Sequence, residues 1–278
     1  MTTTTDVTDA PAADPASAGP AAAPRRSRTY LLQLLCFGGV IALWALTGAL
    51  HLISDTALPS PWATADTFGH LLGQGGFWAA VGTTLRDAVV GLLTAAVIGV
   101  PLGLVTGTYA AAEESSRLLV DFLRSFPVIA LLPVFLLVLG STASMKQTVV
   151  FIACVFPVFL QAQYGARSVP PMIAETVRAY RIPRLLRFRR VILPSATPSI
   201  MTGLRLAATT SVLVAIGVEI LTTLPGIGHE VTQEQQSGNS DAAFAFIFTA
   251  GLVGYGINRA SMFLEKSLLR WRPPAHPS

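Results

Sequence analysis

Residues 88–112 read AVVGLLTAAVIGVPLGLVTGTYAAA and contain no charged side chain. A helix of about 20 apolar residues is long enough to cross the hydrocarbon core of a bilayer. Uncharged runs of similar length cover residues 30–54, 125–145 and 147–166. Each of these four runs is therefore predicted to be a membrane-spanning helix.

Two further apolar segments are less regular. Residues 198–221 contain Arg205 and Glu219, and residues 242–258 are short, although a helix there could extend through Arg259. The whole chain is 52% hydrophobic and 12% charged, whereas soluble domains carry about 25% charged residues. We therefore expect an all-α polytopic membrane protein with about six transmembrane helices.

The expected domain organisation follows from the same composition. Residues 30–272 form the predicted transmembrane domain, and residues 273–278 form a short C-terminal tail. Residues 1–29 begin with a stretch rich in Thr, Ala, Pro and Asp, which lacks the apolar content needed to fold. We expect this segment to be a disordered cytoplasmic tail.

Basic residues are distributed unevenly over the connections between the predicted spans. Cytoplasmic loops of membrane proteins are enriched in Lys and Arg. With the N-terminus inside, residues 55–77, 140–147 and 222–241 lie outside and contain only Lys146. The inner segments contain most of the 19 basic residues, namely Arg25, Arg26, Arg28, Arg117, Arg167, Arg178, Arg181, Arg184, Arg187, Arg189, Arg190, Arg259, Lys266, Arg270 and Arg272. The predicted location is a cell membrane, crossed several times, with both termini cytoplasmic.

Several other functional classes receive no support. The arginines of residues 178–190 are explained by retention on the inner face, and no interleaved aromatic residues suggest stacking on nucleic-acid bases. Cys36 and Cys154 lie in apolar runs, and the four histidines lack metal-ligand spacing. We expect no catalytic site, no disulfide and no metal site in this chain.

The cytoplasmic segment 167–194 is too long for a simple turn and has helical periodicity. Pro171 suits the first turn of a helix, in which Ile173, Val177 and Tyr180 share one face. Pro183 breaks this helix and can begin a second one, which Pro194 closes. Amphipathicity alone leaves two interpretations open, a docking surface for another subunit or a helix pair resting in the lipid headgroups.

The spacing of certain residues in this segment resembles the EAA signature of ABC-importer permeases. Glu175, Thr176 and Val177 stand at the Glu-Ala-Ala positions, Arg181 stands at the glycine position, and residues 191–194 end in Leu193 and Pro194. Other stretches resemble permeases of the nitrate/sulfonate/taurine type in the same order, namely residues 58–61, 124–127, 132–133, 202–205 and 225–228. The resemblance covers about residues 30–272.

The resemblance implies a function and partners. It identifies the chain as a permease subunit that forms the path for a small solute. The segment from Glu175 to Pro194, with Tyr180 on its apolar face, would couple it to an ATP-binding cassette subunit. That partner would bind and hydrolyse ATP, so no cofactor is expected in this chain, which lacks a phosphate-cradling glycine-rich motif. A second permease chain, identical or different, and an external solute-binding protein complete the expected assembly.

The signature departs from its usual form at the glycine position. A glycine there permits a sharp turn that is costly for other residues, and this chain has Arg181. We interpret Pro183 as the residue that makes the break instead. A further hypothesis is that this chain is the divergent half of a heterodimeric permease. Two copies in a complex without a sister chain would contradict that hypothesis.

Arg205 and Glu219 are candidate path or gate residues because charges within spans are costly and often functional. Arg205 could instead extend to the inner surface, and Glu219 could cap a neighbouring helix, with Asp87 and Arg86 as possible partners. Glycines at positions 91, 99, 103 and 107 favour close helix packing over a pore-lining role.

The alternative functional class is a stand-alone secondary transporter or channel. That class predicts inverted repeats with paired broken helices and ion sites near the middle of the bilayer. The sequence shows no clear repeat and no acidic residue near the middle of a span.

Overall fold

The computed structural model describes residues 26–50, 54 and 57–269 of the 278-residue chain. These residues form helices joined by short connections, and no strand occurs among them. The predicted tails, residues 1–29 and 273–278, lie almost entirely outside this part, except that a helix already begins at Arg26. The chain divides into two units at Leu52, so α1 (Arg26–Ala49) is described by itself.

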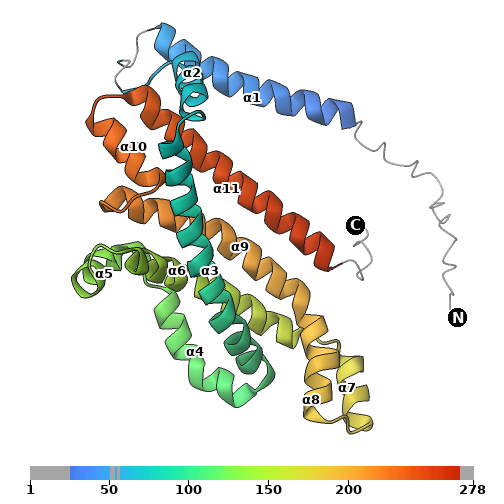
Figure 1. The fold of residues 1–278 in the computed structure, drawn as a ribbon. Helices are drawn as coiled ribbons and strands as arrows, with labels where there is room; N and C mark the ends of the chain where they lie inside the picture. Colours follow the sequence, from blue (N-terminus) through green and yellow to red (C-terminus); the bar gives the residue numbers. More distant parts are fainter. Residues whose placement is uncertain (1–25, 51–53, 55–56, 270–278) are drawn as a thin grey trace, which may run out of the picture. The chain divides into compact units, whose positions relative to one another are not determined.

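The second unit contains ten α-helices among the described residues (Figure 1). They are α2 (Pro61–Leu71), α3 (Gly75–Thr108), α4 (Ala110–Arg124), α5 (Leu132–Leu139), α6 (Ala143–Arg167), α7 (Pro171–Ala179), α8 (Arg184–Arg187), α9 (Leu193–Leu221), α10 (Ile227–Gln236) and α11 (Ser240–Leu268). A 3₁₀ turn at Val128–Leu131 precedes α5, and a π-helical segment at Phe188–Ile192 joins α8 to α9.

The predicted all-α polytopic fold is confirmed. Within the described residues, five helical segments are long and apolar enough to cross a membrane, and a sixth span exists if one bent pair is counted. The segment expected to be short is a helix of 29 residues, α11. The helix continues past Asn258 and contains Arg259 and Glu265 in its C-terminal part.

The third predicted span, residues 125–145, has different bounds in the structure and contains a sharp bend. The chain there forms α4 and the segment 128–139, which meet at an angle of 77°. Pro127 and Pro133 lie at the break and in the first turn of α5, and Gly140 ends α5 with a positive φ of 67°. Proline removes a backbone donor and glycine adopts a conformation unfavourable for other residues, so these positions set the limits of α5.

Two other prolines do not interrupt their spans. Pro101 lies inside α3 and Pro157 lies inside α6, and both helices continue past them. Neighbouring helices can satisfy the backbone groups that such a proline frees in a membrane protein. These two helices pack closely against each other.

The core of the second unit lies where α3, α6 and α9 pack together. Fully buried residues of all three helices form one apolar cluster, which includes Ala88, Ala95, Val149, Val150, Cys154, Val158, Ala207, Ala215 and Val218. A second cluster joins α2, α3, α10 and α11 through residues such as Leu71, Phe77, Ile227 and Phe246. These clusters fix the positions of the helix ends that carry the functional residues.

Glycines bring α3 and α6 into close contact. A Cβ atom at Gly103 would lie 2.7 Å from Ala162 Cβ, and one at Gly107 would lie 2.7 Å from Ala166 Cβ. At Gly91 it would meet Val150 Cγ1 at 2.6 Å. Small residues permit this close approach of two helix backbones in a membrane. The prediction that this glycine series serves packing is confirmed.

Candidate functional site

The segment expected to dock a partner is a helical hairpin. The helix α7 (Pro171–Ala179) is followed by a turn and by the single helical turn of α8, at one end of the unit beside the end of α3 (Figure 1). Val177 is buried, whereas Glu175 and Thr176 are exposed and Tyr180 is 79% exposed. Of the three residues expected to share an apolar face, Val177 is buried, whereas Ile173 and Tyr180 are exposed, so most of this face is uncovered in this chain.

Arg181 makes the turn between α7 and α8. Its φ is +48°, the only positive φ of a non-glycine residue in the described part of the chain. The Ile182 amide donates to the Val177 carbonyl at 3.1 Å, and the Arg181 amide donates to the Arg178 carbonyl at 3.0 Å. This pair of bonds is the Schellman motif, in which the residue that takes the left-handed conformation is usually glycine.

The interpretation that Pro183 replaces the missing glycine is therefore wrong. Arg181 itself adopts the glycine conformation, and Pro183 has φ −57° and immediately precedes α8. A residue with a Cβ atom loses about 1–2 kcal/mol in the left-handed region. The surrounding hydrogen bonds hold Arg181 in this strained state.

The substitution Arg181→Gly is expected to stabilise the hairpin. Relief of left-handed strain should contribute about 1 kcal/mol, partly offset by the greater freedom of glycine in the unfolded chain. Amide hydrogen exchange at Ile182 should slow in R181G. The control Arg184→Gly places glycine in the helical turn of α8 and should instead speed exchange nearby. Equal exchange in both variants would contradict the strain at Arg181.

The helix after the hairpin does not stop at Pro194. The chain continues from α8 through the π segment into α9, and the Leu193 amide donates to the Phe188 carbonyl five residues earlier. Pro194 has no N–H to donate to Arg190, and a wider turn also accommodates its ring. The prediction that Pro194 closes a separate helix is wrong, and Leu193 and Pro194 form the exposed first turn of α9.

A groove of about 680 Å³ lies between the hairpin and the end of α3. Its lining includes Thr108 and Tyr109 from the end of α3, together with Arg184, Leu185 and Phe188. The hairpin therefore lies at the same end of the bundle as the carboxyl end of α3.

Glu219 lies at the other end of α9 and is completely buried. Lys146 Nζ is 2.9 Å from its Oε1 atom, and the Thr84 hydroxyl donates to it at 2.9 Å. The Gly228 amide, in the first turn of α10, donates to Glu219 Oε2 at 3.0 Å. Anionic groups are favourable at helix N-termini, where amides lack partners. Glu219 thus caps α10, which was one of its possible roles.

Lys146 joins Glu219 to a second buried carboxylate. Its Nζ atom lies 2.6 Å from Asp87 Oδ2 and donates to the Pro225 carbonyl at 3.1 Å. Arg86 and Gln147 donate to Asp87 Oδ1. Asp87 Oδ2 receives no hydrogen bond of good geometry from the described residues, so this oxygen is balanced by the ion pair with Lys146. Burial of a charge requires such pairing.

We call Lys146, Asp87 and Glu219 the buried charge cluster. It ties together α3, α6, α9 and the turn before α10. Asp87 is a predicted partner of Glu219, but the two carboxylates do not bond to each other directly. Each forms an ion pair with Lys146, which lies in α6 and not in the outer loop predicted from the sequence. The position of Lys146 as a single charge between two apolar runs is the sequence feature that could have indicated a buried partner for Glu219.

Arg205 is not part of this cluster. Its guanidinium lies 3.2 Å from Glu265 Oε2, so the pair links α9 to α11. Glu265 lies near the C-terminal end of α11, beyond its most apolar part. Both side chains are partly exposed, and the pair neutralises a charge that would otherwise be costly among apolar helices.

No group of His, Cys, Asp and Glu side chains in the described residues is arranged to hold a metal ion. The fold and these features define a multi-pass membrane subunit, with an exposed helical hairpin at one end of its helices and a buried charge cluster toward the other.

Comparison with known proteins identifies the family. Residues 99–270 match the family described as binding-protein-dependent transport system inner membrane component. The chain therefore belongs to this family and is the permease subunit of an ABC importer.

Individual relatives agree with the family match. A protein of Bacillus subtilis (strain 168) that carries the name of an aliphatic sulfonates transport permease, SsuC, is 27% identical over 248 residues, 89% of this chain and 90% of the relative. The nitrate import permease protein NrtB of Leptolyngbya laminosa is 30% identical over 196 residues, 70% of each chain. A solved chain of the inward-facing MetNI methionine ABC transporter has a TM-score of 0.63 at 19% identity and covers 70% of this chain and 97% of that chain. The last comparison supports the fold.

Proposed function

We propose that this permease imports a small oxoanion of the aliphatic sulfonate class. In this proposal, an ATPase subunit binds the hairpin of α7 and α8 and drives transport. The observation that carries the coupling role is the Schellman turn at Arg181, which reproduces the glycine conformation of the EAA signature. The names of the relatives, which include sulfonate and nitrate permeases, support the substrate class.

The ATPase contacts the exposed side of the hairpin in this proposal. Glu175, Thr176 and Tyr180 are exposed there, and Leu193 and Pro194 begin the helix that would carry the motion inward. The partner binds and hydrolyses ATP, and this chain contributes no cofactor site. Both termini are cytoplasmic, since the arginine-rich hairpin lies on the inner face of the membrane.

The outer end of the permease carries the proposed gate. Two permease chains, identical or different, enclose the path, and a solute-binding protein docks on the connections that contain α2 and α10. Glu219 caps α10 and bonds to Lys146 beside the Pro225 turn, so this carboxylate holds an outer loop to three spans. Arg205 stiffens the inner half through its pair with Glu265.

The docking proposal is tested by the substitution Tyr180→Ala. Large exposed aromatic residues are often the anchors of an interface, and Tyr180 is 79% exposed at the turn. We expect the amount of ATPase that co-purifies with the tagged permease to fall at least tenfold in Y180A. Deletion of residues 172–190 should abolish co-purification.

The matched control is Trp62→Ala, which removes an aromatic residue that is 75% exposed on α2. This variant should retain the ATPase. Unchanged co-purification in Y180A and in the deletion variant would overturn the docking proposal. Transport by this chain alone in vesicles, driven by an ion gradient, would favour a secondary transporter instead.

A further inference from the structure

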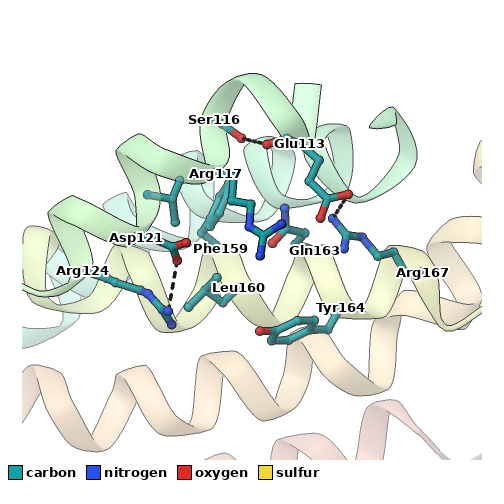
Figure 2. A pocket seen from close by; sticks show the side chains of 11 residues that line it. Glu113, Ser116, Arg117, Asp121, Arg124, Phe159, Leu160, Gln163, Tyr164 and Arg167 are labelled. Carbon is teal, nitrogen blue, oxygen red and sulfur yellow. Dashed lines mark hydrogen bonds and ion pairs between the residues drawn. The ribbon is translucent and has the colours of Figure 1, made fainter. Parts of the chain in front are cut away.

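A polar cavity of about 330 Å³ lies between α4 and α6, away from the buried charge cluster (Figure 2). Its walls contain three arginines and two carboxylates, namely Arg117, Arg124, Arg167, Glu113 and Asp121. The volume falls within the range of small-molecule sites, which is about 300–1,000 Å³. Charged side chains along membrane helices usually face a cavity or a partner and mark functional sites.

The charges of this cavity do not cancel. Glu113 forms an ion pair with Arg167 at 2.5 Å, and Asp121 forms one with Arg124 at 3.0 Å. Arg117 has no carboxylate oxygen within 4.0 Å among the described residues. The cavity therefore carries one uncompensated positive charge, which matches a monoanion.

The uncompensated charge is accompanied by further hydrogen-bond donors. Figure 2 shows the Arg117 side chain extending from α4 toward α6, where Gln163 lies. Neither the Arg117 guanidinium nor the side-chain amide of Gln163 forms a hydrogen bond within the described part of the chain. The Tyr164 hydroxyl also lines the cavity. A guanidinium presents its donors in a planar fork that suits the oxygens of an oxoacid.

The remaining walls are apolar. Val120 comes from α4, and Leu160 and the largely buried Phe159 come from α6. An inorganic ion would leave these side chains without a partner, whereas a short apolar chain on the anion would cover them. The cavity thus has the features of a site for an amphiphilic anion.

The cavity lies in the half of the bundle that carries the hairpin. Glu113 follows the end of α3, and Arg167 is the last residue of α6 before α7. The same part of α6 packs against α3, as the short distance between Gly103 and Ala162 shows. The walls are therefore set by rigid helices of the core on one side and by α4 on the other.

We propose that this cavity binds a monoanionic oxoacid group that carries an apolar chain, with the side chains of Arg117 and Gln163 holding the oxygens. Such a group belongs to a free alkanesulfonate or to an anionic lipid headgroup with its acyl chain. The site lies toward the cytoplasmic end under the orientation of the proposed function, so a free sulfonate would occupy it on the inner side of the gate. The binding itself does not depend on that orientation.

The test measures ethanesulfonate binding to the full-length permease in nanodiscs of phosphatidylcholine, by isothermal titration calorimetry. Arg117→Gln should weaken binding at least tenfold, and Arg117→Lys should recover part of it because it keeps the charge without the fork. Arg259→Gln removes an exposed arginine on α11 and should leave binding unchanged. A second arm uses nanodiscs that contain phosphatidylglycerol and no sulfonate, and detects bound lipid by mass spectrometry.

The two arms distinguish the sources of the ligand. Arg117-dependent binding of ethanesulfonate assigns the site to a free anion, and Arg117-dependent retention of phosphatidylglycerol assigns it to lipid. The proposal is overturned if neither ligand binds or if R117Q binds both as the wild type does. Co-purification of the ATPase is recorded in the same preparations, so a failure of the proposed function is seen separately from a failure of this site.

Discussion

Replacement of Lys146 by methionine is expected to destabilise the permease by about 3–5 kcal/mol, since it leaves Asp87 and Glu219 as two buried carboxylates without their shared cation. Lys146 is 1% exposed, so water cannot replace the lost charge. The Glu219 cap on α10 should also loosen. The midpoint of denaturant-induced unfolding in mixed micelles measures the effect.

Two control variants separate the loss of charge balance from a general effect of substitution. The triple variant K146M/D87N/E219Q removes all three charges and should recover much of the lost stability, because no buried charge is then left without a partner of opposite sign. Asp66→Asn breaks an exposed pair with His70 and should change stability by less than about 1 kcal/mol. If K146M unfolds at the wild-type midpoint, the buried charge cluster does not stabilise the fold.

The second large effect is expected from Gly103→Ala. The added methyl group would lie 2.7 Å from Ala162 Cβ and 3.0 Å from the Gln163 amide nitrogen, and it would come closer still to the Phe159 carbonyl oxygen. Backbone atoms cannot move aside as a flexible side chain can, so α3 and α6 must separate. Overpacking of this kind typically costs about 1–3 kcal/mol, and we expect unfolding at lower denaturant concentration together with impaired transport.

The matched control for Gly103→Ala is Gly82→Ala on the same helix. A Cβ atom at Gly82 would meet nothing within 4 Å. Alanine is favoured over glycine in a helix, so G82A should be neutral or stabilising by up to about 1 kcal/mol. A loss of stability in G82A equal to that in G103A would show that the α3–α6 contact is not the cause.

The membrane-spanning character of the chain was predictable because apolar length is a local property of the sequence. The runs at 88–112 and 147–166 correspond to α3 and α6, and the periodicity from Pro171 to Tyr180 corresponds to α7 and its cap. The limits of these helices were less predictable. Prolines that look like breaks, such as Pro101, Pro157 and Pro194, lie within continuous helical segments because neighbouring elements and a π turn accommodate them.

The partners of the charged residues could not be read from the sequence. Lys146 and Glu219 are 73 residues apart in the chain, and only the packing of α6 against α9 brings them together. Likewise, the residues around Arg181 do not show whether Arg181 adopts the left-handed conformation or whether the helix ends at Pro183 instead. The first case depends on tertiary packing, and the second depends on hydrogen bonds between residues 177 and 182 that the residue types alone do not specify.

The uninterrupted course of the chain from α8 to α9 has a mechanical meaning. Residues Arg184–Leu221 form one helical segment of 38 residues, which at about 1.5 Å per residue is some 57 Å long. One end of this segment begins in the hairpin that the proposed ATPase subunit binds. The other end contains Glu219, whose carboxylate caps α10. Under the proposed function the two ends of this segment lie at opposite faces of the bilayer, and the π-helical segment near the hairpin is the place where it can bend. A force applied at the hairpin would then be transmitted along one continuous helical backbone to Glu219, whose side chain holds the outer loop.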